Sequence, residues 1–225
     1  EEIDTNNIIF RYTRTVSVGS SGTETAEGSA TSDTENCTGF PLDTLGDSFA
    51  GSGLWMDEAQ VINFGDHTDF SFTDGAGNDK PFSVVLWTDL NSVSRTQTLF
   101  QKWTGGFEYQ CSLDPENKIY WHISDPAFAN RFYVASAASV LDGNLHCLVC
   151  TYDGNEAKEG AFLYLDTVDI SDARNSVGTY VGMTNGAAIL EIQSFSGAHV
   201  YNAQLYNREL SASEIKALYD QGAYV

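Results

Sequence analysis

Hydrophobic and polar residues alternate along many short segments of this chain, the period-two pattern of half-buried β-strands. From about Leu54 onward these segments are separated by turn clusters of Gly, Asp and Asn, such as residues 74–79. No long amphipathic helix lies between them, so the pattern favours an all-β, antiparallel sandwich over alternating βαβ units. The predicted strands cover residues 60–64, 82–88, 98–102, 107–113, 118–123, 131–136, 145–152, 160–165, 188–195 and 198–206.

One short helix is predicted at the C-terminal end of the chain. Ser211 stands at an N-cap position and Glu214 follows three residues later, so each side chain can bond the other residue's backbone N–H. Leu210 before the cap can pack against Ile215 as a hydrophobic staple. Gly222 supplies a left-handed stop, so we expect the helix to begin after Ser211 and to end near Gly222.

Residues 1–53 differ in composition from the rest of the chain. Residues 7–18 alternate well enough for one or two strands, whereas residues 19–38 consist mainly of Ser, Thr, Gly and acidic residues. Such a run buries little apolar surface, so residues 1–53 are expected to form an extended arm or linker, partly β and of low complexity. A flexible linker and an arm that orders against a neighbouring subunit both fit this composition. Residues 54–225 then form the principal domain.

The composition restricts the partners that the protein can bind. A chain of 225 residues with 42% hydrophobic residues can bury a core without help from disulfides or metal ions. The net charge of −20, from 31 acidic and 11 basic residues, repels phosphate backbones and predicts no nucleic-acid partner. The same charge opposes an anionic membrane surface, and no stretch approaches the roughly 18 to 20 apolar residues that span a bilayer. Membrane insertion is therefore not expected.

The four cysteines, Cys37, Cys111, Cys147 and Cys150, allow three full pairings, among which the sequence does not choose. Cys147 and Cys150 have the spacing of a metal-binding or redox pair. However, they lie in a predicted strand, where residues three apart point to opposite faces. A zinc site also needs a second pair of ligands, so buried free thiols are the expected state.

Five blocks of sequence carry a family resemblance. They read FSVVLW at 82–87, LFQK at 99–102, HCLVCTYDG at 146–154, FLYLD at 162–166 and YNRELSASEIKALY at 206–219. In this order and spacing they resemble the laminin-G-like jelly-roll domains of the concanavalin A-like lectin/glucanase superfamily, over about residues 54–222. The resemblance implies an antiparallel jelly-roll sandwich of two sheets with one short C-terminal helix.

Calcium is a candidate cofactor on the strength of this resemblance. The family fold would bring the start of the domain near its final strand, and carboxylate and amide oxygens are the ligands that Ca²⁺ prefers. The candidate metal ligands are Asp57, Asp66, Asp69 and Asn202. However, Tyr201-Asn202 stands where the family often has an acidic pair, and no spaced loop motif is present. A solvated acidic surface is the alternative.

Enzymatic activity is not predicted, although the superfamily includes glucanases. Glycoside hydrolysis needs two carboxylates that share one face of a strand, and the related glucanases carry such acids on one strand. In the comparable segment, residues 188–195, Glu191 stands alone, with Gln193 and Phe195 at the later positions. The four histidines are scattered, and no Ser lies in a nucleophile-elbow pattern. The sequence therefore offers no catalytic residues.

The outward side chains of the middle strands form a candidate ligand face. Strand parity directs Ile119, Trp121 and Ile123 to the core and leaves Tyr120 and His122 on the outer side. Sugars are recognised by aromatic faces together with hydrogen bonds from flanking polar side chains. The same parity applies to the neighbouring strands, and Trp103 ends its strand just before Gly105-Gly106, where it can overhang the same surface. The predicted ligand-binding residues are therefore Trp103, Glu108, Gln110, Tyr120, His122, Arg131 and Tyr133. Ordinary half-buried sheet residues are the alternative interpretation.

Two functions fit these features. The first is a non-catalytic surface module that recognises a carbohydrate or glycan. The second is a structural surface protein of a virion or cell envelope, a decoration or fibre subunit, in which residues 1–53 attach the jelly roll to neighbouring subunits. Both predict an extracellular, cell-surface or virion-surface location.

Overall fold

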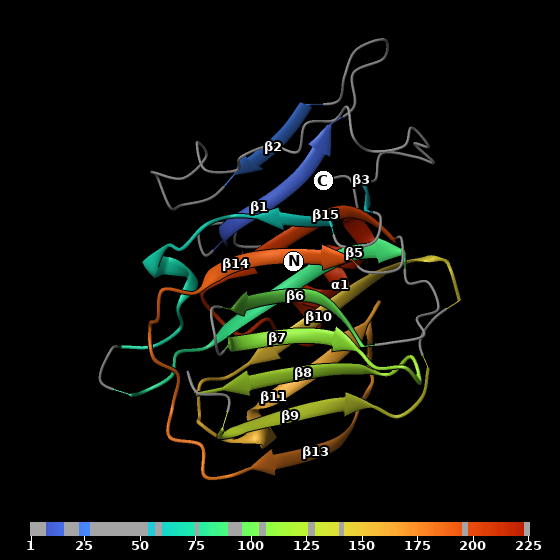
Figure 1. The fold of residues 1–225 in the computed structure, drawn as a ribbon. Coiled ribbons are helices and arrows are strands. Elements are labelled where there is room, and N and C mark those ends of the chain that lie inside the picture. The colour runs from blue at the N-terminus through green and yellow to red at the C-terminus, as the bar shows by residue number, and fades with distance from the viewer. Residues whose placement is uncertain are drawn as a thin grey trace.

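The computed structural model describes residues 8–15, 23–27, 54–56, 60–74, 77–89, 96–103, 107–125, 129–139, 142–194 and 198–222. These residues form two antiparallel sheets, stacked face to face, and one α-helix (Figure 1). The structure therefore confirms the predicted all-β sandwich with a single short helix near its C-terminal end.

One sheet has eight strands. They are β1 (Ile8–Thr15), β2 (Thr23–Glu27), β3 (Leu54–Met56), β5 (Phe82–Asp89), β10 (Leu145–Tyr152), β11 (Ala161–Leu165), β12 (Val168–Asp169) and β15 (Ala198–Tyr206). Their order is β12-β11-β10-β5-β15-β1-β2, and β3 pairs with the first residues of β15.

The other sheet has seven strands. They are β4 (Gln60–Asn63), β6 (Gln97–Trp103), β7 (Phe107–Leu113), β8 (Ile119–Ser124), β9 (Arg131–Ser136), β13 (Ser171–Val177) and β14 (Ile189–Ser194). Their order is β13-β9-β8-β7-β6-β14-β4, and Figure 1 shows most of them side by side in front of the other sheet. Two short 3₁₀ turns, η3 (Thr68–Phe70) and η4 (Lys158–Gly160), precede β5 and β11.

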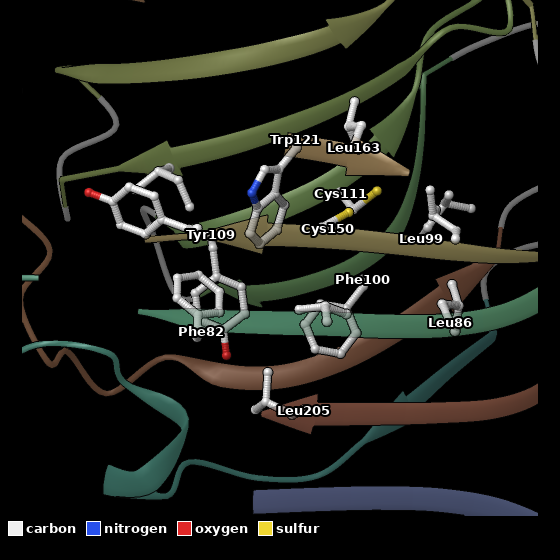
Figure 2. Close-up of a cluster of buried hydrophobic side chains, with 14 of the residues drawn as sticks. Phe82, Leu86, Leu99, Phe100, Tyr109, Cys111, Trp121, Cys150, Leu163 and Leu205 are labelled. Carbon is white, nitrogen blue, oxygen red and sulfur yellow. The ribbon is translucent and has the colours of Figure 1, made fainter. Parts of the chain in front are cut away.

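The space between the sheets is filled mainly by aromatic and aliphatic side chains. Phe82 stands at the centre, where its ring packs against those of Tyr109 and Trp121 at centroid distances of 4.9 and 5.6 Å (Figure 2). The fully buried Trp121 also donates a hydrogen bond from Nε1 to the carbonyl oxygen of Thr151, 3.1 Å away on the opposite sheet. The inward positions predicted from strand parity in β7 and β8 are therefore the core positions of the structure.

The helix α1 (Ala212–Gln221) covers the outer face of the eight-stranded sheet. Ile215 and Leu218 are buried there against Trp87, and the ring of Tyr219 stacks on Trp87 at 5.8 Å. The predicted capping box is present, because Ser211 Oγ accepts from the backbone N–H of Glu214 and Glu214 Oε2 accepts from that of Ser211. Local sequence thus defines where the helix begins, and packing on the sheet holds it.

Three cysteines are free and buried in the described part of the chain. Cys147 lies in the cluster beneath α1 and Cys150 lies between the sheets, so the two point to opposite faces of β10 as predicted. Cys111 reaches toward Cys150 from the facing sheet (Figure 2). Cys37 lies outside the described residues.

The N-terminal segment contributes strands to the domain's own sheet. β1, which falls in the predicted strand region 7–18, pairs with β15, and β2 pairs with β1. β2 lies within the Ser, Thr and acid-rich run that the composition assigned to an arm or linker. An alternating Thr and Glu pattern suits an edge strand, because charged edges discourage further pairing.

We expect Ser211→Ala to lower the free energy of unfolding by about 1 kcal/mol, because the Glu214 backbone N–H loses its acceptor. Ser213→Ala is the matched control, since the exposed hydroxyl of Ser213 contacts the Ser211 hydroxyl rather than a backbone group. Urea denaturation followed by circular dichroism measures both. Equal stability of the two variants would contradict the capping box.

Cys111, Cys147 and Cys150 are expected to resist alkylation in the folded protein. All three are buried, and burial raises the pKa of the Cys147 and Cys150 thiols, which disfavours the reactive thiolate. Iodoacetamide labelling with peptide mass spectrometry should find these residues modified only after denaturant is added. Labelling in native buffer at the rate of a free thiol would show that these cysteines are exposed, which would contradict the strand register of the structure.

Candidate functional site

A row of opposed side chains crosses the seven-stranded sheet on its outer face. Strand pairing places Gln101 of β6 opposite Glu191 of β14 and Gln110 of β7. His122 of β8 lies opposite Gln110 and Tyr133 of β9. Directly opposed residues share a face, and the alternate residues of these strands fill the core, so this set points outward. We define the outer row as Glu191, Gln101, Gln110, His122, Tyr133 and, on β13, Asn175.

Side-chain hydrogen bonds connect one end of the outer row. Gln101 Nε2 donates to Glu191 Oε2 over 3.0 Å, and Gln110 Nε2 donates to Gln101 Oε1 over 2.9 Å. Gln110 Nε2 also donates to Thr98 Oγ1 over 3.1 Å. The amides of two neighbouring strands are therefore held in defined orientations rather than projecting freely into water.

Aromatic rings occupy the other part of this face. The ring centroid of Tyr133 lies 5.2 Å from that of His122 and 5.6 Å from that of Tyr120. Tyr120 and His122, two residues apart on β8, stack with an interplanar angle of 16°. We call these three residues the aromatic cluster. They are half-buried, so each presents part of a ring to solvent on a rigid strand.

Two members of the aromatic cluster have shifted pKa values. Burial, together with the nearby positive charge of Arg131, lowers the pKa of His122 to about 4. Burial, together with the carboxylate of Asp114, raises the pKa of Tyr120. Near neutral pH His122 and Tyr120 are therefore uncharged, with the guanidinium of Arg131 close to His122 and the carboxylate of Asp114 close to Tyr120.

Glu108 is not part of the open face, which corrects its predicted placement. Its side chain is only 2% exposed, and Glu108 Oε1 accepts a hydrogen bond of 2.9 Å from Lys102 Nζ. The same oxygen accepts bonds from the Ser71 hydroxyl and the backbone N–H of Gly186. Burial raises the pKa of Glu108, and the adjacent Lys102 opposes that shift. Strand parity could not reveal that two other segments cover this end of β7.

The remaining predicted ligand-binding residues fall into two groups. Gln110, Arg131 and the aromatic cluster lie together on the outer face. Trp103 ends β6 with its backbone opposite Ile189, and its side chain lies outside the described part of the structure. Whether this face binds a ligand stays a prediction.

Three members of the outer row were not among the predicted ligand-binding residues: Glu191 was considered only as a catalytic acid, and Gln101 and Asn175 were not singled out. Gln101 could have been found from its alternation with Phe100, although a register irregularity between Thr98 and Phe100 interrupts the simple parity of β6. Asn175 lies on β13, an edge strand that has no hydrophobic alternation.

The described members of the predicted calcium set each have a partner within the protein. Asp66 and Asp69 lie in the segment that follows β4. Asp66 forms an ion pair with Lys102, and the carboxylate of Asp69 lies 3.5 Å from Nδ1 of His67. Asn202 is 1% exposed in the eight-stranded sheet and accepts a hydrogen bond from Gln204. Asp57 lies outside the described residues. Among the described residues, no three His, Cys, Asp or Glu side chains are placed to hold a metal ion, and whether this set binds calcium stays a prediction.

His146 is held between two carboxylates. Its Nε2 lies 2.9 Å from Asp142 Oδ1 and its Nδ1 lies 3.0 Å from Asp166 Oδ2. Burial opposes protonation of His146, but the hydrogen bonds to Asp142 and Asp166 outweigh it and raise the pKa. Both ring nitrogens are engaged, so His146 ties β10 to its flanking turns and is not free to activate a nucleophile.

A family model described as the concanavalin A-like lectin/glucanases superfamily, Laminin_G_3, matches residues 64–216. The chain belongs to this family. The Laminin_G_3 match begins directly after β4 and ends within α1, so it includes the middle strands of both sheets and the outer row.

Solved structures that share this fold include toxin binding domains. The binding domain of botulinum neurotoxin DC in complex with SialylT has a TM-score of 0.58 and 9% identity, over 79% of this chain and 44% of that one. The binding domain of Paraclostridial Mosquitocidal Protein 1 has a TM-score of 0.59 and 13% identity, over 78% and 45%. The Laminin_G_3 chain thus spans less than half of these structures, and the likeness establishes the fold. No curated protein sequence matches.

We expect His122 and His146 to titrate on opposite sides of the ordinary histidine pKa of 6.5. An NMR titration of the ring C–H signals should give a midpoint of about 4 for His122 and a midpoint above 6.5 for His146. A midpoint near 6.5 for His122 would show that its ring is more exposed to water than it is in the structure.

The free energy of unfolding should depend on pH in the directions set by these two pKa shifts. The contribution of His122 is present above pH 6.5 and is lost as the pH falls through about 4, because the unfolded chain binds the proton more readily. The contribution of His146 is present below pH 6.5 and is lost as the pH rises through its raised pKa. His146→Asn should therefore destabilise more at about pH 5.5 than at about pH 8.5, measured by urea denaturation.

Proposed function

We propose that this protein is a non-catalytic, carbohydrate-recognising surface module that binds glycan on the outer face of its seven-stranded sheet. The observation that carries the proposal is the aromatic cluster of Tyr120, His122 and Tyr133, set beside the hydrogen-bonding amides of the outer row. Aromatic rings pack on the C–H surfaces of sugars, and amides pair with hydroxyl groups.

The dimensions of the outer row suit an oligosaccharide. Neighbouring strands are about 4.8 Å apart, so the three strand separations from Gln101 to Tyr133 span about 14 Å. This length is that of a short run of linked sugar rings rather than one ring. The residues lie on paired strands instead of loops, so little ordering entropy opposes binding.

The structural neighbours add support at the level of the fold. One neighbour is described in complex with SialylT, and another by the statement that cell entry of botulinum neurotoxin type C is dependent upon interaction with two ganglioside molecules. The latter has a TM-score of 0.58 and 8% identity, over 79% of this chain and 44% of that one. These ligands belong to those proteins, of which this chain matches 44%, so the support for glycan binding rests on the shared fold.

The absence of catalysis is part of the proposal. Glu191 accepts a hydrogen bond from Gln101 Nε2, and the residues opposite it on the adjacent strands are Gln101 and Asn63. A retaining or inverting glycosidase needs a second carboxylate across the scissile bond. Amides at the opposed positions supply hydrogen bonds but no acid or base.

The alternative function, a structural surface protein attached through its N-terminal arm, has less support. β1 and β2 are used within the domain's own sheet, so attachment would need other segments. No helix in the described part of the chain is long and apolar enough to cross a membrane. We place the module outside the cell or on a cell or virion surface as part of the same proposal.

A glycan array that includes neutral and sialylated oligosaccharides tests the proposal. We expect Tyr133→Ala to weaken binding of the best glycan about tenfold, roughly 1.4 kcal/mol, because a rigid, half-buried aromatic contact is lost. Tyr219→Ala is the matched control: its ring is also partly exposed, but it stacks on Trp87 beneath α1 on the other sheet.

Two results would contradict the proposal. The first is a failure of the array test: either the wild-type protein binds no glycan, or Tyr133→Ala and Tyr219→Ala reduce binding of the best glycan equally. The second is polysaccharide turnover by the purified protein that disappears in Glu191→Gln, which would make the module an enzyme.

A further inference from the structure

The hydrogen bonds at one end of the outer row all run in the same direction. Gln110 Nε2 donates to Gln101 Oε1, and Gln101 Nε2 donates to Glu191 Oε2. Each residue lies on a different strand, in the order β7, β6 and β14, and the strands are directly paired. We call this chain of bonds the amide chain.

A single carboxylate is sufficient to set that direction. A glutamine amide can donate or accept, so two glutamines alone permit either orientation, whereas an ionised carboxylate only accepts. Gln101 must therefore turn its nitrogen toward Glu191, which leaves Gln101 Oε1 toward Gln110. Gln101 is only 6% exposed, so water does not readily replace either bond.

The direction of the amide chain determines what Gln110 presents to a ligand. Both hydrogens of Gln110 Nε2 have acceptors, in Gln101 Oε1 and Thr98 Oγ1. Gln110 Oε1 accepts no hydrogen bond from the described residues, and it is not among the buried side-chain atoms that lack a partner. This oxygen is therefore open to solvent, on the residue that lies opposite His122 of the aromatic cluster.

We propose that Glu191 is a positioning residue: through Gln101 it fixes the direction of the amide chain and so presents Gln110 Oε1 as an acceptor for a hydroxyl or N–H group of the glycan. This inference rests on the proposed function. It gives the lone carboxylate of β14 a role in recognition, and it requires a ligand that donates a hydrogen bond beside the face of an aromatic ring.

Reversing the chain provides the sharpest test. Gln110→Glu alone places a carboxylate against Gln101 Oε1, so two acceptors face each other while Glu191 prevents Gln101 from turning. Glu191→Gln alone removes the constraint on direction. With both substitutions, the amide introduced at position 191 donates to Gln101 Oε1, and Gln101 Nε2 donates to the carboxylate introduced at position 110. Net charge and composition are unchanged, and the Thr98 hydroxyl serves either direction.

The first measurement is the folding equilibrium constant of the full chain and the three variants, from urea denaturation. Gln110→Glu should lower the constant about tenfold or more, and the double variant should recover most of that loss, because a buried acceptor regains its donor. Strictly additive effects of the two substitutions would overturn the positioning role of Glu191.

The second measurement is specific to orientation. In the wild type, the side-chain NH₂ groups of Gln101 and Gln110 should each give one set of NMR signals, shifted and slow to exchange with solvent. Glu191→Gln should broaden or double both sets without a comparable change at the Asn144 NH₂, which bonds to Asp142 away from the outer face. Unchanged signals in Glu191→Gln would also overturn the proposal.

The third measurement uses the glycan that the wild type binds most tightly on the array. Glu191→Gln should weaken it about threefold to tenfold, and the double variant should bind more tightly than Glu191→Gln, since an acceptor oxygen again stands at position 110. Equal binding by both overturns the ligand half of the proposal. If the wild type binds no glycan, the proposed function and the role of Gln110 Oε1 in ligand binding both fail. The urea denaturation of the three variants then tests the direction of the amide chain by itself.

Discussion

The packing of the two sheets on one aromatic core is the constraint on which the rest of the structure depends. Tyr109, Trp121 and Phe82 meet at its centre, and the Trp121 indole also bonds to the backbone of the facing sheet. Because side chains alternate along a strand, a shift of register by one residue would turn each of these rings into water. The core therefore fixes which residues of β7, β8 and β9 point outward, and Gln110, His122 and Tyr133 are the result.

Polar side chains on that outer face need hydrogen-bond partners where they are buried, as polar groups in the interior do. Buried amides and charges need partners, and the structure meets this need with Glu191 for Gln101 at one position and with Lys102 for Glu108 at another. The two carboxylates have different consequences. Glu108 is closed off by Ser71 and Gly186, which tie neighbouring segments over the sheet, whereas Glu191 orients amides that stay at the surface. Burial thus separates structural polar residues from candidate binding residues.

Local patterns in the sequence predicted the central strands, the capped helix and the opposite faces of Cys147 and Cys150, because each depends on residues close together in the chain. β13 was missed, since an edge strand needs no hydrophobic alternation. The burial of Glu108 beneath Ser71 and Gly186 depends on how distant segments pack. Within the candidate site, strand parity predicted which side chains of β8 and β9 point outward, but the bonds that link Gln101 to Glu191 follow only from strand order.

The charge of the chain bears on which glycans suit this face. The protein carries a net charge of −20, yet His122 of the aromatic cluster is neutral near pH 7, and the carboxylate of Glu191 accepts a hydrogen bond from Gln101. Surface charges act over about 8 Å at physiological ionic strength, so acidic residues beyond that distance contribute little to the field at the cluster. Arg131 is the basic group adjacent to His122. In the proposed complex a neutral sugar does not depend on these charges. An anionic sugar would be attracted by Arg131 and Lys118 and repelled by Asp114, so the position of its charge on this face decides between the two classes.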